Sequence, residues 1–215
     1  MEQWYLYKKK ADFTKIGEKF QIDPVIARLI RNRDVIGDEE IHKYLYGNLS
    51  DISDPFLMKG VREGVDIIRE KIRDRKTIRI ISDYDVDGVV SNYILWKAIY
   101  DLGGMIDFQI PDRMKDGYGI NDHLIEQADE AGIDTIITCD NGIAAANEIA
   151  YGKELGMTII VTDHHEIPFD EIDGEKIYRL PPADAVIDPK QKDCVYPFKG
   201  LCGAAVAYKL MEALW

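Results

Sequence analysis

From Thr77 to the end of the chain, short runs of β-branched and apolar residues alternate with longer stretches of helical character. This alternation constrains the fold more than any other feature, because strands separated by helices build parallel β-α-β units. The runs typical of strands are residues 78–82, 106–110, 135–139, 158–162 and 185–188. Helices are expected at residues 89–102, 122–131, 144–155 and 204–214. We therefore predict an α/β domain with a parallel β-sheet flanked by helices.

The first 76 residues have helical character with short breaks, so we expect a small helical segment over 1–76 before a domain over 77–215. Asp23 followed by Pro24 is a typical helix start, because the aspartate can cap the helix and proline fits its first turn. Residues 61–75 predict an amphipathic helix with a basic end. A solvated helix face explains these basic residues better than the alternative, which is contact with phosphates.

The composition excludes several classes of protein. Lys and Arg number 27 against 39 Asp and Glu, and the net charge of −12 argues against an extended nucleic-acid surface. The negative charge does not exclude a nucleic-acid enzyme, because bound cations can offset the negative electrostatic field at the site. The three cysteines form no Cys-x-x-Cys pair, so neither structural zinc nor a disulfide framework is expected. Without a signal sequence or an apolar run of transmembrane length, we expect a cytoplasmic protein that contacts no membrane.

Three aspartates, Asp83, Asp85 and Asp87, follow the first predicted strand at alternate positions, and Gly88 comes next. In extended backbone, alternate side chains point to the same side, so this spacing can bring three carboxylates together. Carboxylates that lie so close repel each other unless protons or cations neutralise them. The sequence therefore predicts a site for hard divalent cations, which prefer oxygen ligands. An acidic turn exposed to solvent is the alternative.

Polar residues also follow the next three predicted strands. Because the carboxyl ends of parallel strands meet along one edge of a sheet, we expect these residues to gather there. They are Pro111-Asp112-Arg113 and Gly117-Tyr118-Gly119-Ile120-Asn121 after the second strand, Asp140-Asn141-Gly142 after the third, and Asp163-His164-His165 after the fourth.

Each of these residues has more than one interpretation. Asp140 taken alone is typical of a helix N-cap. In extended backbone His164 and His165 would face opposite sides, so one could bind a metal ion while the other contacts a second ion or the substrate. Asp163 could orient an imidazole by a hydrogen bond without binding the metal itself. Arg113 is either a surface residue or, near clustered carboxylates, a ligand for an anionic substrate, since guanidinium matches phosphate.

Mixed Asp and His ligands suit manganese or magnesium in a site with two ions. Two such ions can bind a phosphate ester, generate hydroxide at neutral pH and stabilise the leaving oxygen. Hydrolysis of a phosphodiester or a phosphoanhydride is thus the expected reaction. The sequence has no Gly-x-Ser-x-Gly elbow, P-loop or Gly-x-Gly-x-x-Gly fingerprint. A serine hydrolase, an NTPase and a dinucleotide enzyme are correspondingly disfavoured.

The motifs, in this order, resemble those of the DHH phosphoesterases. The resemblance is carried by Asp83-Tyr84-Asp85-Val86-Asp87-Gly88, Pro111-x-Arg113 with Gly117-Tyr118-Gly119, Asp140-x-Gly142 and Asp163-His164-His165. Within that family, Asn32-Arg33, Asp54-Pro55-Phe56-Leu57-Met58 and Tyr196-Pro197-Phe198-Lys199-Gly200-Leu201-Cys202-Gly203 resemble flanking segments of the RecJ branch. The likeness covers nearly the whole chain, and the ordered set is specific although each motif alone is not.

The resemblance implies a single-stranded-DNA-specific exonuclease that works 5′ to 3′, releases 5′-mononucleotides with two Mn²⁺ or Mg²⁺ ions, and acts in DNA repair and recombination. It implies metal ligands at Asp85, Asp87, Asp140 and His164, with Asp83 and His165 completing the metal shell or contacting the substrate. Further substrate contacts are implied for Arg113, Gly117, Tyr118 and Asn121. For Asp163 the implied role is to orient a metal ligand without binding the metal. Single-stranded DNA, a single-strand-binding protein and a repair helicase are the implied partners.

Two features depart from the family pattern. The family's later Gly-Thr-x-x-Asp segment supplies another metal ligand, and this sequence has no Gly-Thr dipeptide. Relatives often have Asn in place of Asp188, so we do not assign Asp188 to the metal. We expect an incomplete domain at the carboxyl end, with weak metal binding and little nuclease activity of the 215-residue chain by itself. A DHH phosphodiesterase for short oligonucleotides or cyclic dinucleotides, and a non-catalytic DHH replication scaffold, are the alternatives.

Overall fold

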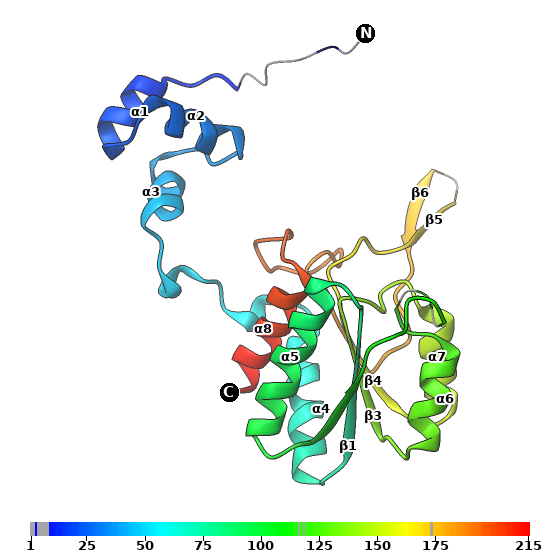
Figure 1. Ribbon diagram of the computed structural model, residues 1–215. Coiled ribbons are helices and arrows are strands. Elements are labelled where there is room, and N and C mark those ends of the chain that lie inside the picture. Colours follow the sequence, from blue (N-terminus) through cyan, green and yellow to red (C-terminus); the bar gives the residue numbers. More distant parts are fainter. Residues whose placement is uncertain (1–2, 4–8, 116, 118, 173) are drawn as a thin grey trace. The chain divides into compact units, whose positions relative to one another are not determined.

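The computed structural model describes residue 3 and residues 9–115, 117, 119–172 and 174–215, and most of its helices and strands are labelled in Figure 1. The chain divides into two compact units, Met1–Ser53 and Asp54–Trp215. Within the part of the chain that the structure describes, no helix is long and apolar enough to cross a membrane.

The first unit is helical, as predicted. It contains α1 (Phe13–Phe20), α2 (Pro24–Asn32), α3 (Asp38–Tyr46) and the 3-10 turn η1 (Leu49–Asp51). The predicted start of α2 is confirmed, because the Asp23 carboxylate accepts the backbone N–H of Val25 at 2.8 Å. Phe20, Ile30 and Ile41, one from each α-helix, form its small apolar core.

The second unit is built on a five-stranded parallel sheet in the order β2-β1-β3-β4-β7 (Figure 1). Its strands are β1 (Thr77–Ser82), β2 (Met105–Gln109), β3 (Thr135–Cys139), β4 (Thr158–Thr162) and β7 (Ala185–Ile187). In the register, Ser82 lies opposite Cys139, Cys139 opposite Thr162, and Thr162 opposite Ile187. The predicted parallel sheet is confirmed, with each strand end within one residue of its expected position.

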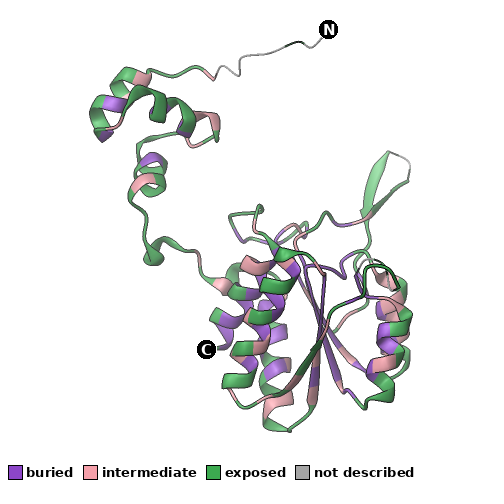
Figure 2. Cartoon of the chain, in the orientation of Figure 1, coloured by how far each residue is buried: buried purple, intermediate pink, exposed green. Residues whose placement is uncertain are grey.

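Helices cover both faces of this sheet (Figure 1). On one face lie α4 (Val61–Arg73), α5 (Val86–Asp101) and α8 (Gly203–Leu214), and on the other α6 (Asp122–Glu130) and α7 (Ala146–Glu154). Successive strand residues enter the two cores in turn, so that Ile80 packs with the first set of helices and Ile81 with the second. Figure 2 shows buried residues along the strands and on the helix faces turned toward them. The result is a three-layer α/β/α arrangement.

The division between the two units differs from the boundary expected at residue 76. Residues 54–76, which include the 3-10 turn η2 (Pro55–Leu57) and α4, belong to the second unit. Val61, Val65 and Ile68 of α4 are fully or almost fully buried in the same core as the sheet. The amphipathic pattern of this helix was predicted correctly. The boundary differs because the apolar face of the helix packs against the sheet that follows it in the sequence.

The prediction missed a two-stranded antiparallel hairpin formed by β5 (Phe169–Ile172) and β6 (Glu175–Tyr178). The sequence between the strands is Asp-Gly, a strong signal for a tight hairpin, and Gly174 has a φ of 81°. All residues of both strands are exposed, so the hairpin lacks the buried apolar run by which the other strands were found.

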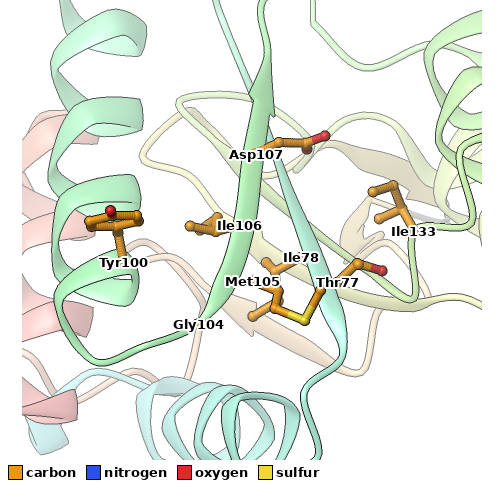
Figure 3. A pocket seen from close by; sticks show the side chains of 8 residues that line it. All are labelled: Thr77, Ile78, Tyr100, Gly104, Met105, Ile106, Asp107 and Ile133. Atoms are coloured by element: carbon orange, nitrogen blue, oxygen red, sulfur yellow. The ribbon is translucent and has the colours of Figure 1, made fainter.

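A cavity of about 380 Å³ lies beside β2 (Figure 3). Thr77 and Met105, the first residues of β1 and β2, line it together with Tyr100. Figure 3 shows Ile106 pointing toward Tyr100 and Asp107 pointing to the other side of the strand. The cavity is at the amino ends of these strands, away from the carboxyl edge, and none of the predicted functional residues lines it.

Candidate active site and metal centre

Four strands of the sheet end immediately before an aspartate. Asp83 follows β1, Asp140 follows β3, Asp163 follows β4 and Asp188 follows β7. Because the residues that precede them are paired in register, the four aspartates form a row along the carboxyl edge of the sheet. Each is at most 3% exposed. Carboxylates set side by side and out of water require positive charge or protons to be stable.

Asp83, Asp85 and Asp140 form one group of potential metal ligands, each offering a carboxylate oxygen within 4.8 Å of the others. The Asp85 carboxylate also caps α5, accepting the backbone N–H of Gly88 at 3.0 Å. Oδ1 of Asp83 is buried and has no hydrogen-bond partner among the described residues. A divalent cation with oxygen ligands would satisfy that atom.

Asp140, His164 and His165 form a second such group, again with ligand atoms within 4.8 Å of one another. Nε2 of His164 lies 3.0 Å from Oδ1 of Asp140. Asp140 therefore belongs to both groups and joins them. A carboxylate shared by two neighbouring groups is the arrangement expected of a centre for two ions.

The two imidazoles do not face opposite sides, so that expectation was wrong. Their ring centroids are 4.5 Å apart, and both residues belong to the same ligand group. The physical reason is a turn: β4 ends at Thr162, and the Asp163 carboxylate accepts the backbone N–H groups of His164 at 2.7 Å and His165 at 3.2 Å. The backbone is no longer extended there, and the alternation of side chains does not apply.

Asp163 also holds the imidazole of His165. Its Oδ1 lies 2.7 Å from His165 Nδ1, and its Oδ2 accepts the backbone N–H of Ile143 at 2.9 Å. Burial acts to raise the pKa of Asp163, but the hydrogen bonds from His165 and the backbone outweigh it and the pKa is lowered. The same bond to Asp163 raises the pKa of His165. This is the geometry of a carboxylate that orients an imidazole.

Asp87 lies in the first turn of α5 rather than in extended backbone. The expected helix start at residue 89 was wrong, because the Asp85 cap starts the helix at Val86. Asp87 accepts the backbone N–H groups of Gly203 at 2.7 Å and Ala204 at 2.8 Å, and its Oδ2 lies 3.5 Å from His164 Nε2. A carboxylate from α5 thus caps α8 and borders the two ligand groups.

Sequence reasoning missed Gly203. A Cβ at this position would lie 2.6 Å from Oδ1 of Asp140 and 2.8 Å from its Cβ, closer than such atoms approach one another. Only glycine therefore allows the start of α8 to approach Asp140. The signal lay in the run Leu201-Cys202-Gly203, which had carried part of the family resemblance without being given a role.

Asp140 has a φ of 61°, in the left-handed region that residues other than glycine rarely adopt. It is not a helix N-cap, because α7 starts only at Ala146, and that interpretation was wrong. The turn is locked by the Thr138 hydroxyl, which donates to the carbonyl of Asn141 at 2.9 Å. From this turn the carboxylate of Asp140 takes part in both ligand groups.

Burial, followed by the charges of Asp87 and Asp85, raises the pKa of Asp140 from 3.8 to about 7. Burial likewise raises the pKa of Asp83. The carboxylates of this edge therefore cannot all be ionised at neutral pH without added positive charge. Divalent cations would supply that charge, and the donor set of carboxylate oxygens and imidazole nitrogens fits Mn²⁺ or Mg²⁺.

Arg113 follows β2 and lies over the rim of the site. The guanidinium carbon is 5.5 Å from the ring centroid of Tyr84. The positive charge of Arg113 lowers the pKa of Asp83 and so opposes the larger effect of burial, which raises it. The structure therefore brings this arginine to the carboxylate edge, where sequence reasoning had placed it as a ligand for an anionic substrate.

Three other residues expected to contact substrate, Gly117, Tyr118 and Asn121, belong in the sequence to the connection between β2 and α6. Asn121 is the N-cap of α6, and its Oδ1 accepts the backbone N–H of Leu124 at 3.0 Å. Gly117 has a φ of 79°, which suits glycine in a turn. Tyr118 lies outside the described residues. Asn121 thus has a structural role that the sequence analysis had not considered.

Asp188, which the sequence analysis did not assign to the metal, is the fourth member of the aspartate row. It is fully buried, and its Oδ1 accepts the backbone N–H of Lys190 at 2.7 Å. Its Oδ2 has no hydrogen-bond partner among the described residues, and burial raises its pKa to about 7. It belongs to neither ligand group found among those residues. Its environment favours the neutral carboxyl group.

Replacing Gly88 with Ala is expected to lower the free energy of unfolding by about 2 kcal/mol or more. The added Cβ would lie 2.4 Å from the carbonyl oxygen of Asp83 and 2.7 Å from its carbonyl carbon, which cannot move without displacing the end of β1. Urea titration measures the change. Val90→Ala, an exposed change on the same helix, is the control and should cost less than about 1 kcal/mol. Equal losses in the two variants would contradict this close packing.

A three-layer α/β domain that gathers carboxylates and imidazoles at the carboxyl ends of parallel strands is typical of metal-dependent phosphoesterases. The chain belongs to the DHH family, since the sequence model described as DHH family, N-terminal domain, matches residues 77–214.

Similar proteins include the single-stranded-DNA-specific exonuclease RecJ of Bacillus subtilis (strain 168), 40% identical over 213 residues, or 99% of this chain and 26% of that protein. RecJ of Escherichia coli (strain K12) is 35% identical over 90% of this chain and 32% of that protein. A crystal structure of exonuclease RecJ bound to manganese matches with a TM-score of 0.63 at 32% identity, over 73% of this chain and 37% of that one. The chain thus spans about a third or less of the length of these curated relatives.

Proposed function

We propose that this protein is a single-stranded-DNA-specific exonuclease, which hydrolyses phosphodiester bonds from the 5′ end and releases 5′-mononucleotides. The observation that carries the proposal is the pair of ligand groups joined through Asp140 at the carboxyl edge of a DHH domain. The chemical class follows from that site, and the substrate from similarity to proteins named as single-stranded-DNA-specific exonucleases. Polarity, products and a role in DNA repair and recombination rest on the resemblance to RecJ.

The proposed metal ligands are Asp83, Asp85, Asp87, Asp140 and His164, and the proposed ions are Mn²⁺ or Mg²⁺. A similar protein, RecJ from Thermus thermophilus, has been crystallised in complex with Mn²⁺. Ions bound here would polarise the phosphodiester and stabilise charge on the attacking and leaving oxygens. The protein's own part is to hold the carboxylates together against their repulsion, with both oxygens of Asp87 fixed by the start of α8.

Residues around this centre are proposed to hold the strand: Arg113, Gly117, Tyr118, Asn121 and His165. Arg113 is suited to a phosphate because its guanidinium offers a planar fork of donors and already lies against Tyr84. The Nδ1 of His165 is engaged by Asp163, which leaves the other ring nitrogen available for the substrate. The raised pKa of His165 favours the charged imidazolium, and a cation beside the reacting phosphate stabilises its negative charge.

Removal of divalent metal is expected to reduce nuclease activity at least 100-fold and to lower the melting temperature. The physical reason is that ions bound only by the folded protein stabilise it, by about 2.7 kcal/mol at a concentration 100 times Kd. Activity and thermal unfolding are measured after treatment with EDTA, and excess Mn²⁺ added back is the control. Full activity in EDTA would contradict the proposed centre.

The substrate is tested by comparing the rates at which the protein hydrolyses 5′-labelled single-stranded and duplex DNA, dinucleotides, cyclic dinucleotides and pyrophosphate. We expect the long single strand to be degraded fastest, with mononucleotides appearing first from its 5′ end. Preferential hydrolysis of dinucleotides would instead support a DHH phosphodiesterase.

We propose a single-strand-binding protein and a repair helicase as further partners, in the cytoplasm. This part rests on the resemblance to RecJ alone. Affinity purification with the protein as bait, repeated after nuclease treatment to remove bridging DNA, tests it. Loss of both partners after that treatment would contradict direct contact.

A further inference from the structure

Two cations lie at the carboxyl edge of the sheet, one after each of its two outer strands. Arg113 follows β2, which is the first strand in the sheet order, and Lys190 follows β7, which is the last. The sequence analysis gave Arg113 a role with phosphate and gave Lys190 none. Since the two ligand groups lie at the strands between them, a polyanion that crosses the carboxyl edge would pass both cations.

The backbone of Lys190 is held rigidly. Its N–H donates to Oδ1 of Asp188 at 2.7 Å. The next residue, Gln191, is buried, and its side-chain amide donates to the carbonyl of Val186 at 2.8 Å. The preceding residue is Pro189, whose φ is restricted by its ring. The turn therefore presents this lysine at a defined place beside the row, and little ordering is needed when it binds a ligand.

The ammonium group of Lys190 has a partner that a phosphate could replace. Its Nζ lies 2.8 Å from Oε1 of Glu166, the residue directly after His165. The Glu166 side chain is 87% exposed, whereas that of Lys190 is 26% exposed. Ion pairs with an exposed carboxylate contribute little, so exchanging Glu166 for a substrate phosphate costs little. The charge of Lys190 already reaches the site, since it acts on both His165 and Asp188.

The separation of the two outer strands suits a strand of DNA. Neighbouring strands of a sheet are about 4.8 Å apart, so the outer strands β2 and β7, which are four steps apart, are separated by roughly 19 Å. Several phosphates of an extended single strand fit into that length. The ligand groups lie between, so a phosphate at Lys190 would belong to a different nucleotide from the one at Arg113.

We propose that Lys190 binds a backbone phosphate of the single strand on the β7 side of the metal centre, opposite Arg113, with Glu166 holding the lysine until DNA displaces it. This inference rests on the proposed function and extends it, because it assigns a second substrate contact and the path of the strand across the sheet edge.

The test is the affinity for a fluorescein-labelled oligothymidylate with phosphorothioate linkages that resist hydrolysis, measured by fluorescence anisotropy in Mg²⁺ at several NaCl concentrations. Lys190→Ala is expected to weaken binding about fivefold and to reduce the slope of log K against log salt by roughly 0.7, the value for one single-strand phosphate contact. Lys192→Ala, an exposed lysine two residues on, should change affinity less than twofold.

Glu166→Gln separates phosphate binding from a merely structural role of the ion pair. It breaks the pair but keeps the lysine, so binding should be unchanged or tighter if Lys190 contacts phosphate. If Glu166→Gln and Lys190→Ala weaken DNA binding equally, the proposal is overturned, and the ion pair serves only to hold the loop in place. An unchanged salt slope in Lys190→Ala would overturn it while leaving the exonuclease function intact. Failure of the unmodified protein to bind the oligonucleotide would overturn both.

Discussion

Asp140→Asn is expected to lower the rate of DNA hydrolysis by a factor on the order of 10³ or more, the largest effect of any single change at the site. Asp140 is the residue common to both ligand groups, so its loss removes a ligand from each. The amide also lacks the negative charge that attracts divalent ions. The measurement is the steady-state rate on labelled single-stranded DNA, together with Mn²⁺ affinity by isothermal titration calorimetry.

Asp101→Asn is the matched control, because Asp101 pairs with Lys97 at the far end of α5 and takes no part in the site. It should leave rate and metal affinity within about twofold of the unmodified protein. Near-normal turnover by Asp140→Asn would contradict a centre joined through this residue. Loss of activity with undiminished Mn²⁺ binding would contradict the assignment of Asp140 as a ligand.

Asp188→Asn is expected to stabilise the protein at pH 8 by about 1–3 kcal/mol. Burial raises the pKa of Asp188 in the folded state from 3.8 to about 7, so the folded protein binds its proton more tightly than the unfolded chain does. That contribution to stability is fully present below pH 4 and is lost as pH rises through 7. Ionising Asp188 in the folded protein costs on the order of 4 kcal/mol, which the neutral amide of Asn avoids. The buried amide group would lack a hydrogen-bond partner, and this offsets part of the gain in stability.

The free energy of unfolding is measured by urea titration in EDTA at pH 5 and pH 8. The difference between Asp188→Asn and the unmodified protein should be larger at pH 8. Asp193→Asn, at an exposed aspartate paired with Lys59, is the control and should change stability by less than about 0.5 kcal/mol. A destabilised Asp188→Asn variant at pH 8 would show that the native carboxyl is charged and compensated.

The parts of the fold that could be predicted are those in which a local pattern coincides with burial. The predicted bounds of β3 (Thr135–Cys139) and β4 (Thr158–Thr162) match the structure, because both are short β-branched runs in the centre of the sheet. The β5–β6 hairpin was missed because its strands are exposed on both sides. The start of α5 was misplaced because Asp85, which caps the helix, was expected to lie in extended backbone after the strand.

The sequence by itself determined the parallel α/β class of this protein and the polar residues that gather at the carboxyl edge, because both depend on short-range patterns and on the geometry of parallel strands. The tertiary structure alone decided which contacts each of those residues makes. Asp140 joins two ligand groups, Asp87 caps a helix that begins at Gly203, and Lys190 faces Glu166. These contacts join residues distant along the chain, and their distances follow from the packing of helices on the sheet, which no local pattern encodes.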